Sequence, residues 1–184
     1  MGLDVAAIRR EFPILERTDH GRRLVYLDTA ATAQKPLAVI EAMDHYYRRL
    51  NANVHRGVYT LAEEATSAFE AGRAATARFI GAGDPHELVL TRNATESINL
   101  VARTWGRANL AEGDVVVVTE MENHANIVPW QMLAAERGIE LRWIPITADY
   151  RLDLSRIDEL LDGASLLAFT AMSNVLGTVN DVPT

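Results

Sequence analysis

The sequence predicts an α/β fold, with a mostly parallel sheet that carries helices on both faces. Short apolar runs typical of strands alternate with helix-compatible segments through the second half of the chain. The expected strands cover residues 87–91, 115–119, 140–146 and 165–170, and the expected helices cover residues 94–106, 125–137 and 154–162. Strands that are joined through helices pair in parallel, and the helices then cover the two faces of the sheet.

The run from Val115 to Thr119 is the most informative of these strands. It holds four valines and a threonine in succession. Continuous runs of this kind are typical of strands that are buried on both faces. We therefore expect this strand to be fully buried.

The first half of the chain is predicted to be mainly helical. Residues 3–12 place Val5, Ile8 and Phe12 on one helical face, and Pro13 ends that helix. The remaining predictions are, in order, a turn at residues 19–21, a short strand at 24–27, a loop of small residues at 28–32, a helix from Pro36 to about Leu50, a loop at 51–57 and an Ala-rich helix at 60–80 that ends at the Gly-rich residues 81–85.

Composition excludes several classes of function. The 184 residues carry a net charge of −7 and show no basic patch, so we expect no nucleic-acid partner. No apolar run is long enough to span a membrane, and the N-terminus lacks the apolar core of a signal peptide. We therefore expect no membrane association and a cytoplasmic location.

Two residue counts restrict the chemistry of these 184 residues. There is no Cys, which excludes disulfides, thiolate metal sites and a cysteine nucleophile within this stretch. Lys35 is the single lysine, so seventeen of the eighteen basic residues are arginines. Any lysine Schiff base would have to use Lys35 or a residue outside these 184.

Polar turns follow three of the expected strands. Residues 92–96 follow the strand at 87–91 and open a helix, where free N–H groups and the Thr95 hydroxyl could bind an anion. Ordinary helix capping by these residues is the alternative. No Gly-rich phosphate loop is present, which disfavours a nucleoside triphosphate.

The other two turns offer an imidazole and an amide. His124 could lie against an aromatic ligand or move protons near neutral pH, and Asn174 could donate a hydrogen bond to a ligand oxygen. The alternatives are a metal site formed by Glu120, Glu122 and His124, for which no second His is placed, or plain turn residues. An anion site, an imidazole and an amide at one sheet edge fit a phosphorylated aromatic cofactor.

A further candidate lies in the first half of the chain. His55 and Arg56, followed by Gly57, could supply a cation for a substrate carboxylate. A solvated loop without a binding role is the alternative for this stretch.

Five collinear motifs make the sequence resemble the cysteine desulfurases of the SufS/CsdA type, within the class V aminotransferase family. They are the segments at residues 26–36 (YLDTAATAQKP), 53–61 (NVHRGVYTL), 95–102 (TESINLVA), 122–131 (ENHANIVPWQ) and 173–178 (SNVLGT). The resemblance covers essentially all 184 residues. Kynureninases and phosphoserine aminotransferases are less similar at the second and fourth motifs.

The resemblance implies a fold and a domain organisation. The fold would be fold type I of the enzymes that depend on pyridoxal 5'-phosphate (PLP). Residues 1–25 would form an N-terminal helix and arm that belong to the small domain. Residues 26–184 would form the front part of the large PLP-binding domain, incomplete at its C-terminus.

The resemblance also implies roles for the matching residues. Ala94 and Thr95 would hold the cofactor phosphate, although the family often has Thr where this chain has Ala94. His124 would stack on the pyridine ring and assist proton transfer, and Asn174 would hydrogen-bond the phenolic oxygen. The substrate-binding residues would be Ala30, Ala31, His55 and Arg56.

The implied activity is the release of L-alanine from L-cysteine, with transfer of persulfide sulfur to an acceptor protein of iron–sulfur cluster assembly, by a homodimer. The family's Schiff-base Lys, the Asp that pairs with the pyridine nitrogen, the nucleophilic Cys and the carboxylate-binding Arg would all follow Thr184. Lys35 matches a different family position and is not assigned the catalytic role. The sequence ends without a finishing helix, so we expect the front part of a longer protein. Two alternatives stay open: a selenocysteine lyase or other class V enzyme, and a non-catalytic fragment or interaction module.

Overall fold

The computed structural model of the chain describes residues 2–181. The chain divides into two compact units, Met1–Val89 and Leu90–Thr184. The domain boundary expected after residue 25 stays a prediction.

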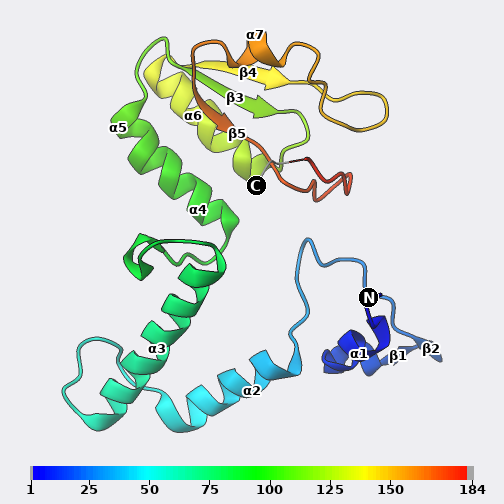
Figure 1. The fold of residues 1–184 in the computed structure, drawn as a ribbon, viewed down its shortest axis with the longest axis vertical. Helices are drawn as coiled ribbons and strands as arrows, with labels where there is room; N and C mark the ends of the chain where they lie inside the picture. Colours follow the sequence, from blue (N-terminus) through cyan, green and yellow to red (C-terminus); the bar gives the residue numbers. More distant parts are fainter. Residues whose placement is uncertain (1, 182–184) are drawn as a thin grey trace. The chain divides into compact units, whose positions relative to one another are not determined.

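The second unit contains a parallel three-stranded sheet in the order β4-β3-β5 (Figure 1). The strands are β3 (Val115–Thr119), β4 (Glu140–Ile144) and β5 (Ala164–Ala168). The centre of β3 is in register with both neighbours, since Val117 lies opposite Arg142 on one side and opposite Leu167 on the other. The predicted parallel sheet is therefore confirmed, with its valine-rich strand β3 at the centre and fully buried.

Helices cover the two faces of this sheet. One face carries α4 (Ala94–Val101), the π-helical turn η4 (Ala102–Gly106), α5 (Arg107–Asn109) and α6 (Val128–Arg137), the last preceded by the 3₁₀ turn η5 (His124–Asn126). The other face carries α7 (Ile157–Leu161). Val116 and Val118 pack with Trp130 on the first face, and Val115 and Val117 pack with residues of α7 on the second. The predicted helix–sheet–helix layering is confirmed.

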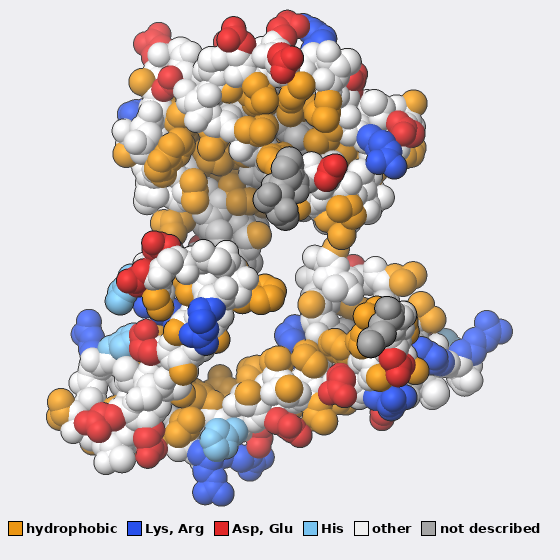
Figure 2. Space-filling model, in the orientation of Figure 1, with side chains coloured by type: hydrophobic (Ala, Val, Ile, Leu, Met, Phe, Trp, Pro, Cys, Tyr) orange, Lys and Arg blue, Asp and Glu red, His pale blue; other side chains and the backbone are white. Residues whose placement is uncertain are grey.

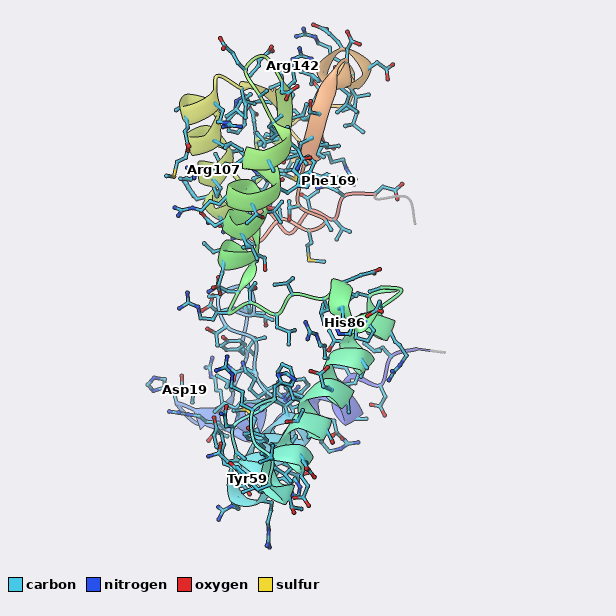
Figure 3. The ribbon with its side chains drawn as sticks, turned by 90° about the vertical axis from the view of Figure 1, so that its left-hand side faces the viewer. Asp19, Tyr59, His86, Arg107, Arg142 and Phe169 are labelled. Atoms are coloured by element: carbon cyan, nitrogen blue, oxygen red, sulfur yellow. The ribbon has the colours of Figure 1, made fainter. Side chains whose placement is uncertain are left out.

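Two close contacts show how tightly these layers pack. A Cβ atom at Gly106 would lie 2.8 Å from the Leu133 side chain, so only glycine allows η4 to approach α6 this closely. On the opposite face, the Arg142 guanidinium of β4 donates to the Asp162 carbonyl oxygen at 2.7 Å and so ties β4 to the end of α7 (Figure 3).

The first unit is built mainly from helices and turns. Its elements are α1 (Val5–Arg10), the 3₁₀ turn η1 (Pro13–Glu16), β1 (Thr18–Asp19), β2 (Arg22–Arg23), α2 (Leu37–His45), the π-helical turn η2 (Tyr46–Leu50), α3 (Thr60–Phe79) and the 3₁₀ turn η3 (Pro85–Glu87). The predicted helices are thus confirmed with slightly different ends. The predicted turn at residues 19–21 joins β1 to β2, with His20 at φ 49° and Gly21 at φ 73°.

Two predicted strands are wrong. Residues 24–27 and 87–91 form no strand in the structure. Val25 and Leu27 are 72% and 90% exposed, and neither residue range pairs with another segment among residues 2–181. An apolar run alone does not make a strand, because a strand also needs a neighbour that accepts and donates its backbone hydrogen bonds.

Several other boundaries differ from the prediction. The strand expected at residues 165–170 ends at Ala168, and the helix expected at 125–137 begins at Val128. The strand expected at residues 140–146 ends at Ile144, because Pro145 follows and has no N–H to donate to a ladder. The helix expected at 154–162 begins only at Ile157. These elements are otherwise where the sequence places them.

The surface of the first unit is rich in hydrophobic side chains. Along α2 (cyan in Figure 1) they are visible in Figure 2, and Leu37, Val39, Ile40 and Met43 are between 41% and 54% exposed. Within residues 2–181, no helix combines the length and the apolar character that crossing a membrane requires.

Candidate functional site

The N-terminus of α4 provides two backbone donors that no described group accepts. Asn93 caps the helix, and its side-chain oxygen accepts from the Glu96 N–H at 2.9 Å. The N–H groups of Ala94 and Thr95, in the first turn, have no hydrogen-bond partner among residues 2–181. Both residues are exposed. Free N–H groups at the positive end of a helix can donate to an anion, and the anion-binding role predicted for these two residues stays a prediction.

A carboxylate supports the turn that precedes this helix. Glu96 accepts from the Arg92 N–H at 2.8 Å and from its guanidinium at 3.1 Å. These two hydrogen bonds, the backbone one first, hold the pKa of the Glu96 carboxyl below its ordinary value. The turn that carries Ala94 and Thr95 is thus held from both sides, by Asn93 and by Glu96.

His124 is the first residue of the turn η5, which begins five residues after the last residue of β3. Asn123 begins this turn, and its side-chain oxygen accepts from the Ala125 N–H at 2.9 Å. The His124 side chain is exposed, whereas Pro129 and Trp130 in the following helix α6 are buried. The imidazole is therefore presented to solvent on a turn whose two ends are anchored in the core.

Helix α4 and the turn η5, which carries His124, are neighbours within the second unit. The free N–H groups of Ala94 and Thr95 and the ring of His124 thus come from two adjacent elements. That they bind one ligand with an anionic group and an aromatic ring stays a prediction.

Asn174 lies in a separate turn after β5. Ser173, which is 3% exposed, accepts from the N–H of Leu176 at 3.1 Å and so shapes the turn. The turn closes through a hydrogen bond of 2.9 Å from the Ser173 N–H to the Thr178 carbonyl oxygen, and Gly177 adopts a left-handed φ of 74°. The Asn174 side chain is exposed at the tip. Its role as a ligand of the cofactor stays a prediction.

The sequence did not reveal the network that connects these turns. Glu122 accepts from the Thr119 hydroxyl at 2.6 Å and from the Thr170 N–H at 2.7 Å through one oxygen, and from the Asn126 amide at 2.8 Å through the other. Asn126 in turn accepts from the Trp130 indole N–H at 3.0 Å. The signal in the sequence was the spacing of four between Glu122, Asn126 and Trp130, which brings side chains together on a helix, although here Glu122 lies before the turn η5.

The carboxylates that a metal site would use have other partners. Both oxygens of Glu122 are occupied by the network above, and Glu120 accepts from the Ile146 N–H at 3.2 Å. Within residues 2–181, no group of three or more His, Cys, Asp or Glu side chains is arranged to hold a metal ion.

In the first unit, Ala30 and Ala31 lie in an exposed turn. The Asp28 carbonyl oxygen accepts from the Ala31 N–H at 3.2 Å, and the Tyr26 hydroxyl lies 2.5 Å from the Thr32 carbonyl oxygen. A pocket beside this turn is lined by Phe12, Leu15, Tyr26, Thr29, Ala33 and Pro36. The two alanines present small side chains at the tip of a turn that Tyr26 holds closed.

His55 is held in an unfavourable backbone conformation by contacts with α3. Its φ of 69° lies in the left-handed region, which costs energy for any residue with a Cβ. Its N–H donates to the Thr66 hydroxyl at 3.0 Å, its Nε2 lies 2.6 Å from a Glu70 oxygen, and its ring meets Phe69 edge-on with centroids 5.5 Å apart. Arg56 follows and is exposed.

Gly57 completes this loop because no larger residue fits. A Cβ at this position would lie 2.2 Å from the Ala62 side chain and 2.9 Å from the Tyr59 ring. The glycine of the His-Arg-Gly segment is therefore explained by packing. The substrate-binding roles predicted for His55 and Arg56 stay predictions.

The chain matches a known family over most of its length. Residues 25–184 match the family model "Aminotransferase class-V". A probable cysteine desulfurase of Streptomyces coelicolor is 52% identical over 186 residues, covering 98% of this chain and 44% of the relative. A cysteine desulfurase of Serratia proteamaculans is 52% identical over 183 residues, covering 99% of this chain and 45% of the relative.

Solved structures give the same result. The apo cysteine desulfurase of Thermococcus onnurineus superposes with a TM-score of 0.87 at 38% identity, over 97% of this chain and 43% of the other. A C-DES variant with glycine linked to its PLP cofactor, 22% identical, shares the fold with a TM-score of 0.67 over 90% of this chain and 41% of the other. The partial domain thus has the type I fold of PLP-dependent enzymes.

This chain spans a little less than half the length of the curated relatives it matches. All five of the motifs singled out in the sequence lie within the matched region. The chain belongs to the class V aminotransferase family.

Proposed function

We propose that the protein containing this chain is a PLP-dependent cysteine desulfurase. One observation carries the proposal: the two free N–H groups at the start of α4 lie on an element in direct contact with the turn that presents His124. The identity of about one half to cysteine desulfurases supports the choice of substrate, L-cysteine. The products would be L-alanine and a persulfide sulfur passed to an acceptor protein of iron–sulfur cluster assembly.

The chemistry of the site fits the phosphate and ring of PLP. The N–H groups of Ala94 and Thr95, together with the Thr95 hydroxyl, would bind the phosphate, because a helix N-terminus favours an anion. The exposed imidazole of His124 would lie on the pyridine ring, and the Asn174 amide would donate to the phenolic oxygen. When bound, PLP supplies an electron sink that stabilises negative charge at the substrate Cα.

The residues of this chain would perform the binding and proton-transfer steps. His124 would hold or move a proton near the substrate, because an imidazole can do both near neutral pH. In the first unit, Ala30 and Ala31 would line the substrate pocket, and His55 and Arg56 would be substrate-binding residues close to the active site, while the family's carboxylate-binding Arg would come from outside these 184 residues. The lysine that carries the cofactor and the cysteine nucleophile would come from residues outside these 184.

The remaining parts of the proposal concern organisation. The protein would be a cytoplasmic homodimer. Residues 1–25 would belong to a small domain, and residues 26–184 to the PLP-binding large domain.

The first test is product analysis with the complete protein, purified from its own cells and loaded with PLP. With L-cysteine and a thiol acceptor we expect alanine and persulfide sulfur in equal amounts. Alanine from L-selenocysteine but not from L-cysteine would identify a selenocysteine lyase. An intact mass of 20.3 kDa without alanine from either substrate would show a non-catalytic chain.

A second test uses the unusual alanine in the phosphate site. The variant Ala94→Thr adds a hydroxyl beside the two free N–H groups, and we expect PLP to bind about threefold to tenfold more tightly, as one added hydrogen bond to a charged group would give. Thr95→Val replaces the hydroxyl by a methyl group of similar size, and it should weaken PLP binding by a similar factor. Equal PLP affinity in all three proteins would contradict the assignment of this helix end to the phosphate.

A further inference from the structure

Glu122 is a half-buried carboxylate that the proposed chemistry does not use. It accepts three hydrogen bonds, from the Thr119 hydroxyl, the Thr170 N–H and the Asn126 amide, at 2.6, 2.7 and 2.8 Å. It forms no ion pair with any residue in the described range 2–181. Burying a carboxylate without a positively charged partner costs free energy. A carboxylate bonded to neutral donors alone is therefore expected to have a specific role.

The two ends of the network determine the direction of every hydrogen bond in it. The Trp130 indole N–H can only donate, so Asn126 must turn its oxygen toward Trp130 and its NH₂ toward Glu122. The Thr170 N–H can also only donate. Residue 122 must therefore accept at both oxygens, which a carboxylate does and a glutamine amide cannot do.

The network joins the three segments on which the candidate site depends. Thr119 ends β3, Asn126 belongs to the turn that begins with His124, and Thr170 follows the end of β5. From Thr170 the connection continues toward Asn174, since the Asn180 amide donates to the Thr170 carbonyl oxygen at 2.6 Å. Asn180 closes the far side of the loop that holds Asn174, where its N–H donates to the Ala171 carbonyl oxygen at 2.9 Å.

We propose that Glu122 is a positioning residue that sets the place of His124 relative to the loop of Asn174. It acts through hydrogen bonds and touches neither substrate nor cofactor. One side chain thus bonds the last residue of β3, the turn of His124 and the backbone after β5, so it would fix the separation between the imidazole and the amide. This proposal rests on the proposed function for its catalytic consequence, while the hydrogen-bond network itself stands independently.

The donor and acceptor directions in the network suggest two substitutions, tested singly and together. In Glu122→Gln, the new NH₂ faces the NH₂ of Asn126, and two donors oppose each other. In Asn126→Asp, two carboxylates oppose each other. In the double variant Glu122→Gln/Asn126→Asp, the glutamine donates to the aspartate, which still accepts from Trp130, and the glutamine oxygen still accepts from Thr170. Every hydrogen bond is then restored with the charge moved to position 126.

The first measurement is hydrogen exchange of the complete protein, followed in peptides that cover residues 120–127 and 168–173. We expect each single variant to exchange about tenfold faster or more in both peptides, because a buried donor loses its acceptor. The double variant should return to within about threefold of the wild type. A double-mutant cycle isolates the coupling between two side chains in contact, here those of residues 122 and 126.

The second measurement is specific to positioning and uses the PLP-loaded enzyme. The visible circular dichroism of bound PLP reports the asymmetry of its surroundings, and it should weaken in each single variant and recover in the double variant. We expect kcat/KM for L-cysteine to fall by about tenfold or more in the single variants, since small displacements of reacting groups are costly. A merely structural role would lower the melting temperature without changing the cofactor signal.

The matched control is Glu120→Gln, in the same turn. This change also removes one negative charge, but a glutamine oxygen can still accept from the Ile146 N–H. It should leave exchange at residues 168–173 unchanged.

Three results would overturn the proposal. They are wild-type exchange in Glu122→Gln, failure of the double variant to recover either signal, and an effect of Glu120→Gln as large as that of Glu122→Gln. If the single variants do not fold and the double variant does, the proposal is supported; if the double variant also fails to fold, it is overturned. An inactive wild-type enzyme with the expected exchange cycle would reject the desulfurase assignment and leave the network in place.

Discussion

The central strand β3 and the long helix α3 differ in how many of their residues are buried. All five residues of β3 are buried, from Val115 to Thr119. Helix α3 has twenty residues, of which only Ala62, Ala65 and Ala77 are buried. These three alanines are also the only buried side chains in the described part of the first unit, residues 2–89. Helix length and Ala content therefore say little about how much apolar surface an element removes from water.

This difference shows what stabilises each unit. The second unit has two apolar clusters, one on each face of its sheet. An alanine buries much less apolar area than a valine or a tryptophan, so the hydrophobic stabilisation within the first unit is small. Its turns depend instead on individual hydrogen bonds, such as those of Tyr26 and His55. We expect the two units to differ in hydrogen exchange and in the effect of truncating a large side chain. Smaller effects are expected from a substitution in one turn and from a change of pH at one contact.

The largest difference is expected in hydrogen exchange of the 184-residue chain. The amides of Val116 to Val118 lie in the middle of a paired and buried strand, so they exchange only when the second unit unfolds. The amides of Val25 to Leu27 have no described acceptor. We expect protection to differ by about three orders of magnitude or more. Similar protection in the two segments, measured by NMR, would contradict the comparison.

Truncation of one large side chain in each unit should show the next largest effect. Trp130 is 3% exposed and packs in the cluster with Val116, so Trp130→Ala should lower the free energy of unfolding of the second unit by about 3–5 kcal/mol. Phe79 is 90% exposed, and Phe79→Ala should change the free energy of unfolding of the first unit by less than about 0.5 kcal/mol. Urea denaturation followed by circular dichroism measures both. A loss at Phe79 as large as that at Trp130 would show that the first unit has a core of its own.

A smaller effect is expected at the turn between β1 and β2. His20 has a φ of 49° and precedes Gly21, and asparagine tolerates this left-handed conformation better than histidine. We expect His20→Asn to stabilise the hairpin by about 0.5 kcal/mol. The change would be seen as slower exchange of the Leu24 amide, which donates to the Arg17 carbonyl oxygen at 3.1 Å across the hairpin, and faster exchange would contradict it. Gly21→Ala is the matched control and should destabilise the turn, because it places a Cβ at a φ of 73°.

The smallest effect is confined to one contact before α4. The pKa of Glu96 is lowered from 4.5, first by the Arg92 N–H and then by its guanidinium. Because the pKa in the folded state lies below the unfolded value, the contact is fully present above about pH 4.5 and is lost as the pH falls through the folded pKa. The Arg92 amide resonance should therefore titrate with a midpoint below 4.5, and this titration should disappear in Glu96→Gln. A midpoint at or above 4.5 would contradict this assignment.

Local sequence patterns predicted most of the second unit. The strands β3, β4 and β5 and the helices α4 and α6 lie where periodicity and composition place them, because burial on one or both faces leaves a direct trace in residue order. The same patterns failed at residues 24–27 and 87–91. An extended apolar segment becomes a strand only beside a partner, and the identity of a partner is not a local property.

By itself, the sequence determined the α/β class, the parallel sheet, the family and the residues at the strand ends that could bind an anion and an aromatic ring. It did so because helix caps, β-branched runs and motif order are properties of neighbouring residues. Only the tertiary structure decided that α4 contacts the turn of His124, that His55 is held by Glu70, and that Glu122 joins β3 to β5. His55 and Glu70 are 15 positions apart in the sequence, and Glu122 and Thr170 are 48 positions apart. Hydrogen bonds between such distant residues depend on how the whole chain folds.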